Sequence, residues 1–176
     1  ESLARAASAA DRKLPLADGL RAALKDTHAD IRREAVGVVL VTDEDALTKA
    51  DALQPLTADP DPDTRGGAIS ALGWLAGAAS RSAPLLVSLL KDPSPAIRGK
   101  AALALGELGA REAEGPLLET LTDQYRPLRL AAAKALATLS GKAGVEALIE
   151  LARSEPDPAV RLEAVLSLAA LYEAYC

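Results

Sequence analysis

The 176-residue sequence contains no phenylalanine, one tryptophan, three tyrosines, one cysteine and one histidine. With His28 as the only histidine, a His-rich zinc or iron centre is excluded, and no Ser-His-Asp set is indicated. We interpret His28 as a solvated residue at a helix cap. Cys176 is the last residue and has no second cysteine to pair with. We therefore expect no metal, no cofactor and no catalytic residues, so the chain is expected not to be an enzyme.

Long apolar runs and an excess of basic residues are also absent. No stretch of about 18 apolar residues indicates a membrane-spanning helix, and residues 1–10 lack the apolar core of a signal peptide. The net charge of −5 disfavours general binding of phosphate groups, and therefore of nucleic acid. A cytoplasmic location is the default expectation. Glu1 in place of methionine indicates a processed N-terminus or a piece of a longer protein.

Alanine and leucine make up most of the 49% of residues that are hydrophobic. Both are strong helix formers. Aromatic and β-branched residues, which favour strands, are scarce in comparison. The composition therefore predicts an all-α protein.

One arginine recurs at a nearly constant interval, with successive copies 33, 33, 31 and 32 residues apart. We number positions from this arginine, so that +3 is the third residue after it. An acidic residue precedes each arginine by six positions, position +3 is always alanine and position +7 is always apolar. Five copies agreeing at four positions predict internal repeats. The arginines are Arg32, Arg65, Arg98, Arg129 and Arg161, and the acidic residues are Asp26, Asp59, Asp92, Asp123 and Glu155.

Each repeat is predicted to be a pair of helices. Apolar residues recur at +3, +4 and +7, which is the spacing of one helix face. The second helix of three repeats is expected to start at an N-cap followed by proline, with Asp61, Ser94 and Asp157 as the caps. Thr42, which precedes acidic residues 43–45, is expected to cap the first helix of the second repeat.

A helix pair of this size cannot bury its apolar face alone, so neighbouring pairs must stack. We therefore predict one domain, residues 1–176, folded as a right-handed α-solenoid of about five two-helix repeats. The small alanine at +3 lets adjacent helices approach closely. The repeats are expected at roughly residues 14–41, 42–77, 78–109, 110–140 and 141–174, with a partial N-terminal helix at residues 1–12.

The paired acidic residues and arginines have a structural interpretation. The acidic residue in each turn can bond the arginine of its own or the next repeat, which would form a ladder along the stack. The alternative is a track of arginines that binds phosphate groups. The acidic residues accompany the arginines one for one, which favours the structural ladder.

The third repeat carries the most specific resemblance. Residues 92–109, DPSPAIRGKAALALGELG, resemble a HEAT repeat of the bacterial type known as the phycobilin-lyase (PBS-lyase) HEAT-like repeat. The resemblance covers roughly residues 14–174 and implies an armadillo-type fold. It is weaker in the first repeat, where residues 38–41 read VVLV, and in the fourth, which lacks the cap residue.

Enzymes with similar repeats are not matched at their functional residues. Deoxyhypusine hydroxylases bind iron through His-Glu pairs, but His28 is followed by Ala29. The HEAT-type alkylpurine DNA glycosylases need a basic concave face with aromatic residues, and no residue marks a bilin site. The resemblance therefore implies a non-catalytic scaffold for protein–protein interaction. The alternatives are an accessory or chaperone-like subunit of a lyase or another modifying enzyme, and a nucleic-acid-binding HEAT protein.

The partner surface is expected on the second helices, which usually line the concave side of such solenoids. The exposed positions there are +1, +2, +5 and near +9. Gly66 and Gly67 form a small-residue stripe with Ser70 and Gly73, flanked by Gly99 and Gly106. In one interpretation Gly73 and Gly106 serve packing between repeats while Gly66 and Gly67 are tolerated drift, and in the other the stripe is the floor of a groove. Trp74 lies at its rim, either exposed or buried against residues 76–80. The candidate binding residues are Arg33, Glu34, Gly66, Gly67, Ser70, Trp74, Gly99, Lys100, Leu103 and Lys134.

The last helix has apolar residues on a second side. Leu162, Leu166 and Ala169 stand where the outer face of a terminal repeat would normally be polar. We expect weak self-association through this helix, although the net charge of −5 opposes it. No residue indicates which protein the partner is.

Overall fold

The structure is a computed structural model that describes residues 18–175, which form helices joined by turns and contain no strand. The partial helix predicted at residues 1–12 and Cys176 lie outside the described residues. The first helices of the repeats, with their 3₁₀ turns, are α2 (Asp18–Ala23), α4 (Ala46–Leu53) with η1 (Gln54–Ala58), η2 (Ala76–Ala78) with α6 (Ala79–Leu89), η3 (Arg111–Ala113) with α8 (Glu114–Thr120), and α10 (Lys142–Ser154). The second helices are α3 (Ala29–Leu40), α5 (Pro62–Gly73), α7 (Pro95–Leu108), α9 (Arg126–Leu139) and α11 (Pro158–Tyr175).

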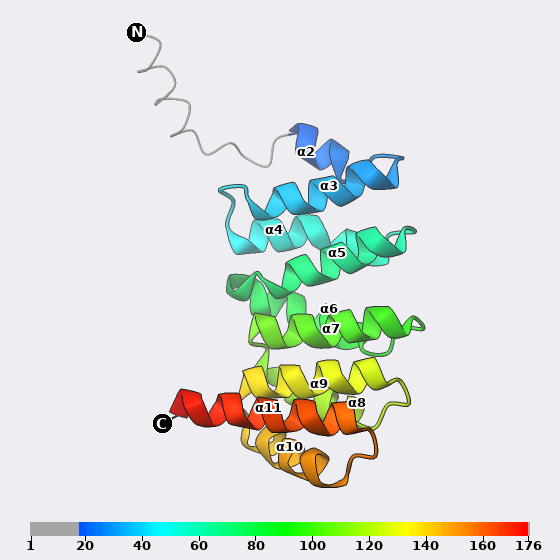
Figure 1. Cartoon of the computed structure of the whole chain (residues 1–176). Coiled ribbons are helices and arrows are strands. Elements are labelled where there is room, and N and C mark those ends of the chain that lie inside the picture. The colour runs from blue at the N-terminus through cyan, green and yellow to red at the C-terminus, as the bar shows by residue number, and fades with distance from the viewer. Residues whose placement is uncertain (1–17, 176) are drawn as a thin grey trace.

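The helix pairs stack into one elongated body. Helices α3, α5, α7, α9 and α11 follow one another in a single layer, and α4, α6, α8 and α10 form the layer behind it (Figure 1). Each second helix contacts the second helix of the next repeat, from α3 with α5 to α9 with α11. The predicted all-α solenoid is confirmed.

Small residues set the spacing between neighbouring helices. A Cβ atom added to Gly73 would lie 2.8 Å from the Cα of Ala104, and one added to Gly106 would lie 2.7 Å from the Cα of Ala135. Both glycines stand at +8 and both alanines at +6 of the following repeat. The second helices therefore touch at their backbones, which accounts for the alanine-rich composition.

Side chains of the turns fix where the second helices begin. The carboxylate of Asp61 accepts a hydrogen bond from the Thr64 amide, and that of Asp157 accepts from the Ala159 amide, as predicted for N-caps. The expected cap at Ser94 is wrong in its chemistry, because its hydroxyl bonds no amide of α7. Instead, the Ser94 amide donates to the carboxylate of Asp92, which orders the turn before the helix starts.

The predicted cap at Thr42 is wrong. The Thr42 hydroxyl donates to the carbonyl of Val39 at the end of α3. Asp45 caps α4 instead and accepts from the amides of Leu47 and Thr48. These bonds hold the pKa of Asp45 below its ordinary value, with the Thr48 amide as the largest cause. Three acidic residues in a row made the cap position ambiguous in the sequence.

Replacing Ala101 by leucine is expected to lower the free energy of unfolding by about 1–3 kcal/mol, because a buried close contact would be overpacked. Ala101 has no exposed surface, and the equivalent Ala132 is expected to behave in the same way. The exposed Ala96 on the same helix is the matched control, and Ala96→Leu should leave stability nearly unchanged. Urea unfolding followed by circular dichroism measures the difference. Equal unfolding midpoints for Ala101→Leu and Ala96→Leu would contradict a packing role for position +3.

Candidate functional site

A series of arginines lies at the turns between first and second helices, and we call it the arginine ladder. Arg32 is buried and the other four arginines are half-buried. Arg32 shows the full geometry of the ladder. Its Nε and Nη2 each donate to Asp59 of the next repeat at 2.7 Å, and both side chains are nearly buried. Its Nη1 donates to the carbonyls of Asp26 and Thr27 in its own turn. Asp59 also accepts from the Asp61 amide.

The contacts with Arg32 hold the pKa of Asp59 below its ordinary value, and the side-chain hydrogen bond from Arg32 is the largest cause. The same hydrogen bond raises the pKa of Arg32. Both groups are therefore charged at neutral pH, and their hydrogen-bonding capacity is used within the fold. This pair is not available to a substrate.

The other arginines repeat this arrangement incompletely. Arg129 Nη2 donates to Glu155 at 2.7 Å, and Arg98 Nη2 lies 3.4 Å from Asp123. Arg65 donates only to the carbonyls of Asp59 and Pro60 among the described residues. The ladder is therefore interrupted between the second and third repeats.

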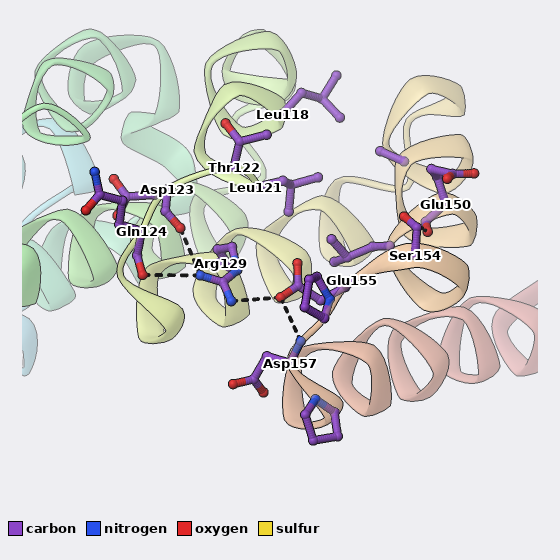
Figure 2. A pocket seen from close by; sticks show the side chains of 14 residues that line it. Leu118, Leu121, Thr122, Asp123, Gln124, Arg129, Glu150, Ser154, Glu155 and Asp157 are labelled. Carbon is purple, nitrogen blue, oxygen red and sulfur yellow. Dashed lines mark hydrogen bonds and ion pairs between the residues drawn. The ribbon is translucent and has the colours of Figure 1, made fainter.

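A groove lies beside the ladder between α8 and α10 (Figure 2). Its volume is about 900 Å³, within the usual range for ligand pockets. Arg129 and Glu155 lie at its centre, where Arg129 also donates to the carbonyls of Asp123 and Gln124. The pattern of spacings did not reveal this groove, because it is formed by helices of two different repeats. Its remaining lining includes Leu118, Leu121, Thr122, Glu150 and Ser154.

The groove offers few groups for chemistry. Glu155 is held by Arg129 and by the Asp157 amide. Residues 18–175 contain no group of three or more histidine, cysteine or acidic side chains arranged to hold a metal ion. The groove is large enough for a polypeptide segment or a small molecule. Its central polar groups, Arg129 and Glu155, bond each other and stabilise the turn.

The expected partner surface on the second helices is only partly exposed. Six of the ten candidate residues are exposed, namely Arg33, Glu34, Trp74, Lys100, Leu103 and Lys134. Gly67, Ser70 and Gly99 are half-buried. The groove-floor interpretation is wrong at Gly66, which is buried beneath the side chain of Lys100. A sequence pattern cannot show that a long side chain of the neighbouring helix covers a glycine.

Trp74 is the largest exposed apolar side chain on this face. It is the C-cap residue of α5, and 63% of its surface is exposed, so residues 76–80 do not cover it. Val41, at the same position of the previous repeat, is 81% exposed, and Leu103 on α7 is 39% exposed. We call these three residues the Trp74 patch.

Two of the charged candidate residues on this face, Arg33 and Lys134, form ion pairs. Arg33 lies 3.4 Å from both Asp30 and Asp61, and Lys134 lies 3.5 Å from Glu163. The Arg33–Asp61 and Lys134–Glu163 pairs join neighbouring repeats, whereas Arg33 and Asp30 lie on the same helix. This arrangement does not resemble the clustered positive charge of a phosphate-binding surface.

His28 lies at the N-cap of α3 and is well exposed, and its ring Nδ1 is 3.0 Å from the carboxylate of Asp26. The His28 amide donates to the same carboxylate and is the main cause of the lowered pKa of Asp26.

In the described part of the chain, no helix is long and apolar enough to cross a bilayer.

The comparisons with known proteins agree on the fold. The family model described as HEAT repeats matches residues 17–90, 50–123 and 114–174. No curated protein matches the chain. Among solved structures, the complex of CpcE and CpcF of phycocyanin lyase from Nostoc sp. PCC7120 is similar, with a TM-score of 0.69, 20% identity, and coverage of 86% of this chain and 97% of that one.

Two engineered repeat structures are also similar. A designed armadillo repeat protein in complex with the peptide (KR)4 has a TM-score of 0.63 and 19% identity, and the match covers 86% of this chain and 80% of that one. A further engineered protein has a TM-score of 0.62 and 21% identity, with coverage of 87% and 78%. At these identities the likeness concerns the fold alone.

Proposed function

Since the chain belongs to the HEAT-repeat family, we propose that it is a non-catalytic scaffold that binds an extended segment of a protein partner across the Trp74 patch. HEAT and armadillo solenoids are folds typical of protein interaction. The observation that carries the proposal is the exposure of Trp74, 63%, on a rigid stack of helices. Tryptophan is enriched among the residues that dominate binding energy at interfaces.

The dimensions of the patch suit a short peptide. Packed helices lie about 8–10 Å apart, so three of them span roughly 20 Å. An extended chain rises about 3.3 Å per residue, so roughly six residues would cross α3, α5 and α7. Trp74 would contact an apolar side chain near the centre of the segment. The pair of Arg33 and Asp61, which joins α3 to the start of α5, favours a segment of mixed charge.

The likeness to the designed armadillo protein supports a peptide ligand, because that structure holds a bound peptide. The likeness to the CpcE–CpcF complex supports a protein partner in general. Neither supplies the identity of the partner, and no residue of the groove or the patch singles out a lyase subunit.

Peptides selected against the wild-type chain from a random displayed library are expected to bind Trp74→Ala at least about 30-fold more weakly, the loss typical of an interface hot spot. Fluorescence anisotropy of a labelled peptide measures each titration, because Trp74→Ala removes the only tryptophan of the chain. The side chain is exposed, so the substitution should leave the helical circular dichroism unchanged. Thr138→Ala, at the equivalent +9 position of α9, is the matched control and should bind like the wild type.

Two outcomes would overturn this proposal. Selected peptides that bind Trp74→Ala as well as the wild type would place the binding surface elsewhere. Binding of a duplex oligonucleotide that weakens steeply between 50 and 200 mM salt, on the order of a thousandfold, would indicate a nucleic-acid-binding protein instead.

A further inference from the structure

The two ends of the described solenoid expose opposite halves of the contact that joins its repeats. Inside the stack, +8 of one second helix meets +6 of the next, as in Gly73 with Ala104 and Gly106 with Ala135. Likewise, Gly67 at +2 of α5 faces Val36 at +4 of α3. Each helix therefore uses +4 and +8 toward the following repeat, and +2 and +6 toward the preceding one.

The +4 side is uncovered only at the C-terminal end. The +4 residues of α3, α5, α7 and α9 are at most 5% exposed, whereas Val165 of α11 is 50% exposed. Ala169 at +8 is exposed beside it, and so is Leu162 at +1, of which 58% is accessible. The covered +4 residues are Val36, Ile69, Ala102 and Ala133.

The +6 side is uncovered only at the N-terminal end of the described residues. The +6 residues of α5, α7, α9 and α11 are at most 6% exposed, whereas Val38 of α3 is 47% exposed. Ile31, at position −1, is 44% exposed, and its counterparts in the later repeats are at most 2% exposed. With Leu20 and Ala23 of α2, these residues line an apolar groove of about 370 Å³.

The arginine ladder lacks a pair at the same two ends, as it also does inside the stack between Arg65 and Asp92. Arg161 donates to the carbonyls of Glu155 and Pro156 in its own turn, but pairs with no carboxylate among residues 18–175. Asp26 accepts from the His28 amide as the inner acidic residues do in their turns, and the His28 ring Nδ1 lies 3.0 Å from its carboxylate. In the described range it pairs with no arginine. The last arginine and the first acidic residue are thus complementary in charge and in position.

We propose that copies of this chain associate head to tail, with α11 of one copy packed on α3 of the next and Arg161 of the first paired with Asp26 of the second. The contact continues the interface that already joins α9 to α11. It is heterologous, so it leaves one free face on each end copy and permits assemblies larger than a dimer. It uses none of the Trp74 patch and stands independently of the proposed function.

The association is weaker than the contact between neighbouring repeats. Inside the stack, +8 and +6 pair glycine with alanine in two places. At the proposed contact, the corresponding residues are Ala169 and Val38, which hold the two helices further apart. The two contact faces also belong to separate molecules, so their association must offset lost translational and rotational freedom.

Sedimentation equilibrium of the full chain tests the proposal through two single variants. Val165→Glu blocks the C-terminal face and Val38→Glu blocks the N-terminal face, both at half-exposed positions where the fold tolerates a charge. Each variant alone is expected to lose at least tenfold in association constant. An equimolar mixture should form a one-to-one heterodimer and nothing larger, because each variant keeps the face that the other lacks. Leu47→Glu, on α4 and 49% exposed, adds the same charge outside both end faces and should associate like the wild type.

A charge exchange tests the ladder pair separately. Arg161→Asp and Asp26→Arg should each weaken association, and the chain carrying both changes should regain it. Thermal unfolding of every variant checks that the fold is kept.

Three results would overturn the proposal. A wild type that stays monomeric at millimolar concentration shows that the two end faces do not bind each other. Dimers of Val38→Glu alone indicate symmetric pairing of two C-terminal helices. If the chain carrying both Arg161→Asp and Asp26→Arg does not regain association, Arg161 and Asp26 do not pair between copies.

Discussion

Asp59→Ala is expected to lower the free energy of unfolding by about 3 kcal/mol, the lower end of the range for a broken buried ion pair. The substitution leaves Nε and Nη2 of the nearly buried Arg32 without a partner and removes the acceptor of the Asp61 amide. Only the Nη1 bonds to the turn carbonyls remain. Urea unfolding at neutral pH measures the loss.

The matched control is the exposed pair of Arg81 and Asp51. It has the same two-bond geometry, at 2.7 and 2.9 Å, but about half of each side chain is exposed. Water replaces these bonds when they are lost, so Asp51→Ala should leave the unfolding midpoint nearly unchanged. Equal losses for Asp59→Ala and Asp51→Ala would show that burial does not determine the strength of the ladder.

The contribution of Asp59 also depends on pH in a fixed direction. Its pKa is lower in the folded chain than in the unfolded chain, so the unfolded state binds the proton first as pH falls. The stabilisation is fully present above the unfolded pKa of about 3.9 and is lost as pH falls through the lowered folded value. The difference in stability between wild type and Asp59→Ala should therefore shrink below about pH 4. A difference that stays constant down to the acid transition would contradict this assignment.

Gly106→Ala is expected to lower the free energy of unfolding by about 2 kcal/mol, even though alanine favours a helix interior by about 1 kcal/mol. The new Cβ would lie 2.7 Å from the Cα of Ala135, and a backbone atom cannot move aside as a side chain can. Helices α7 and α9 would have to separate along their contact. Thermal unfolding followed by circular dichroism measures the change.

Gly99 on the same helix provides the opposite case. No atom lies within 4 Å of a Cβ added there, so Gly99→Ala should gain about 0.5–1 kcal/mol from helix propensity alone. The two substitutions are chemically identical and differ only in their surroundings. A gain at both positions would mean that the close contact of α7 with α9 relaxes without cost.

The sequence by itself determined the repeat period, the helix pairs and the solenoid. Those features follow from local spacing: an arginine every 31 to 33 residues, alanine at +3 and an apolar residue at +7 repeat within each unit and need no knowledge of its neighbours. The acid–arginine pattern was also visible in the sequence, but its spacing left open whether each arginine pairs within its own repeat or with the next.

Only the tertiary structure decided which repeat supplies the partner of each arginine, and which single residues are exposed. The carboxylate that Arg32 reaches is 27 positions away, because stacking brings the next turn beside it. Gly66 and Gly99 occupy the same position in adjacent repeats. Lys100 covers Gly66, whereas no atom lies within 4 Å of a Cβ added to the half-buried Gly99. Val165 is exposed although every preceding +4 residue is buried, since it alone lacks a following helix among the described residues. Local sequence sets which residues lie on each helix face, whereas the neighbouring repeat determines which faces are covered.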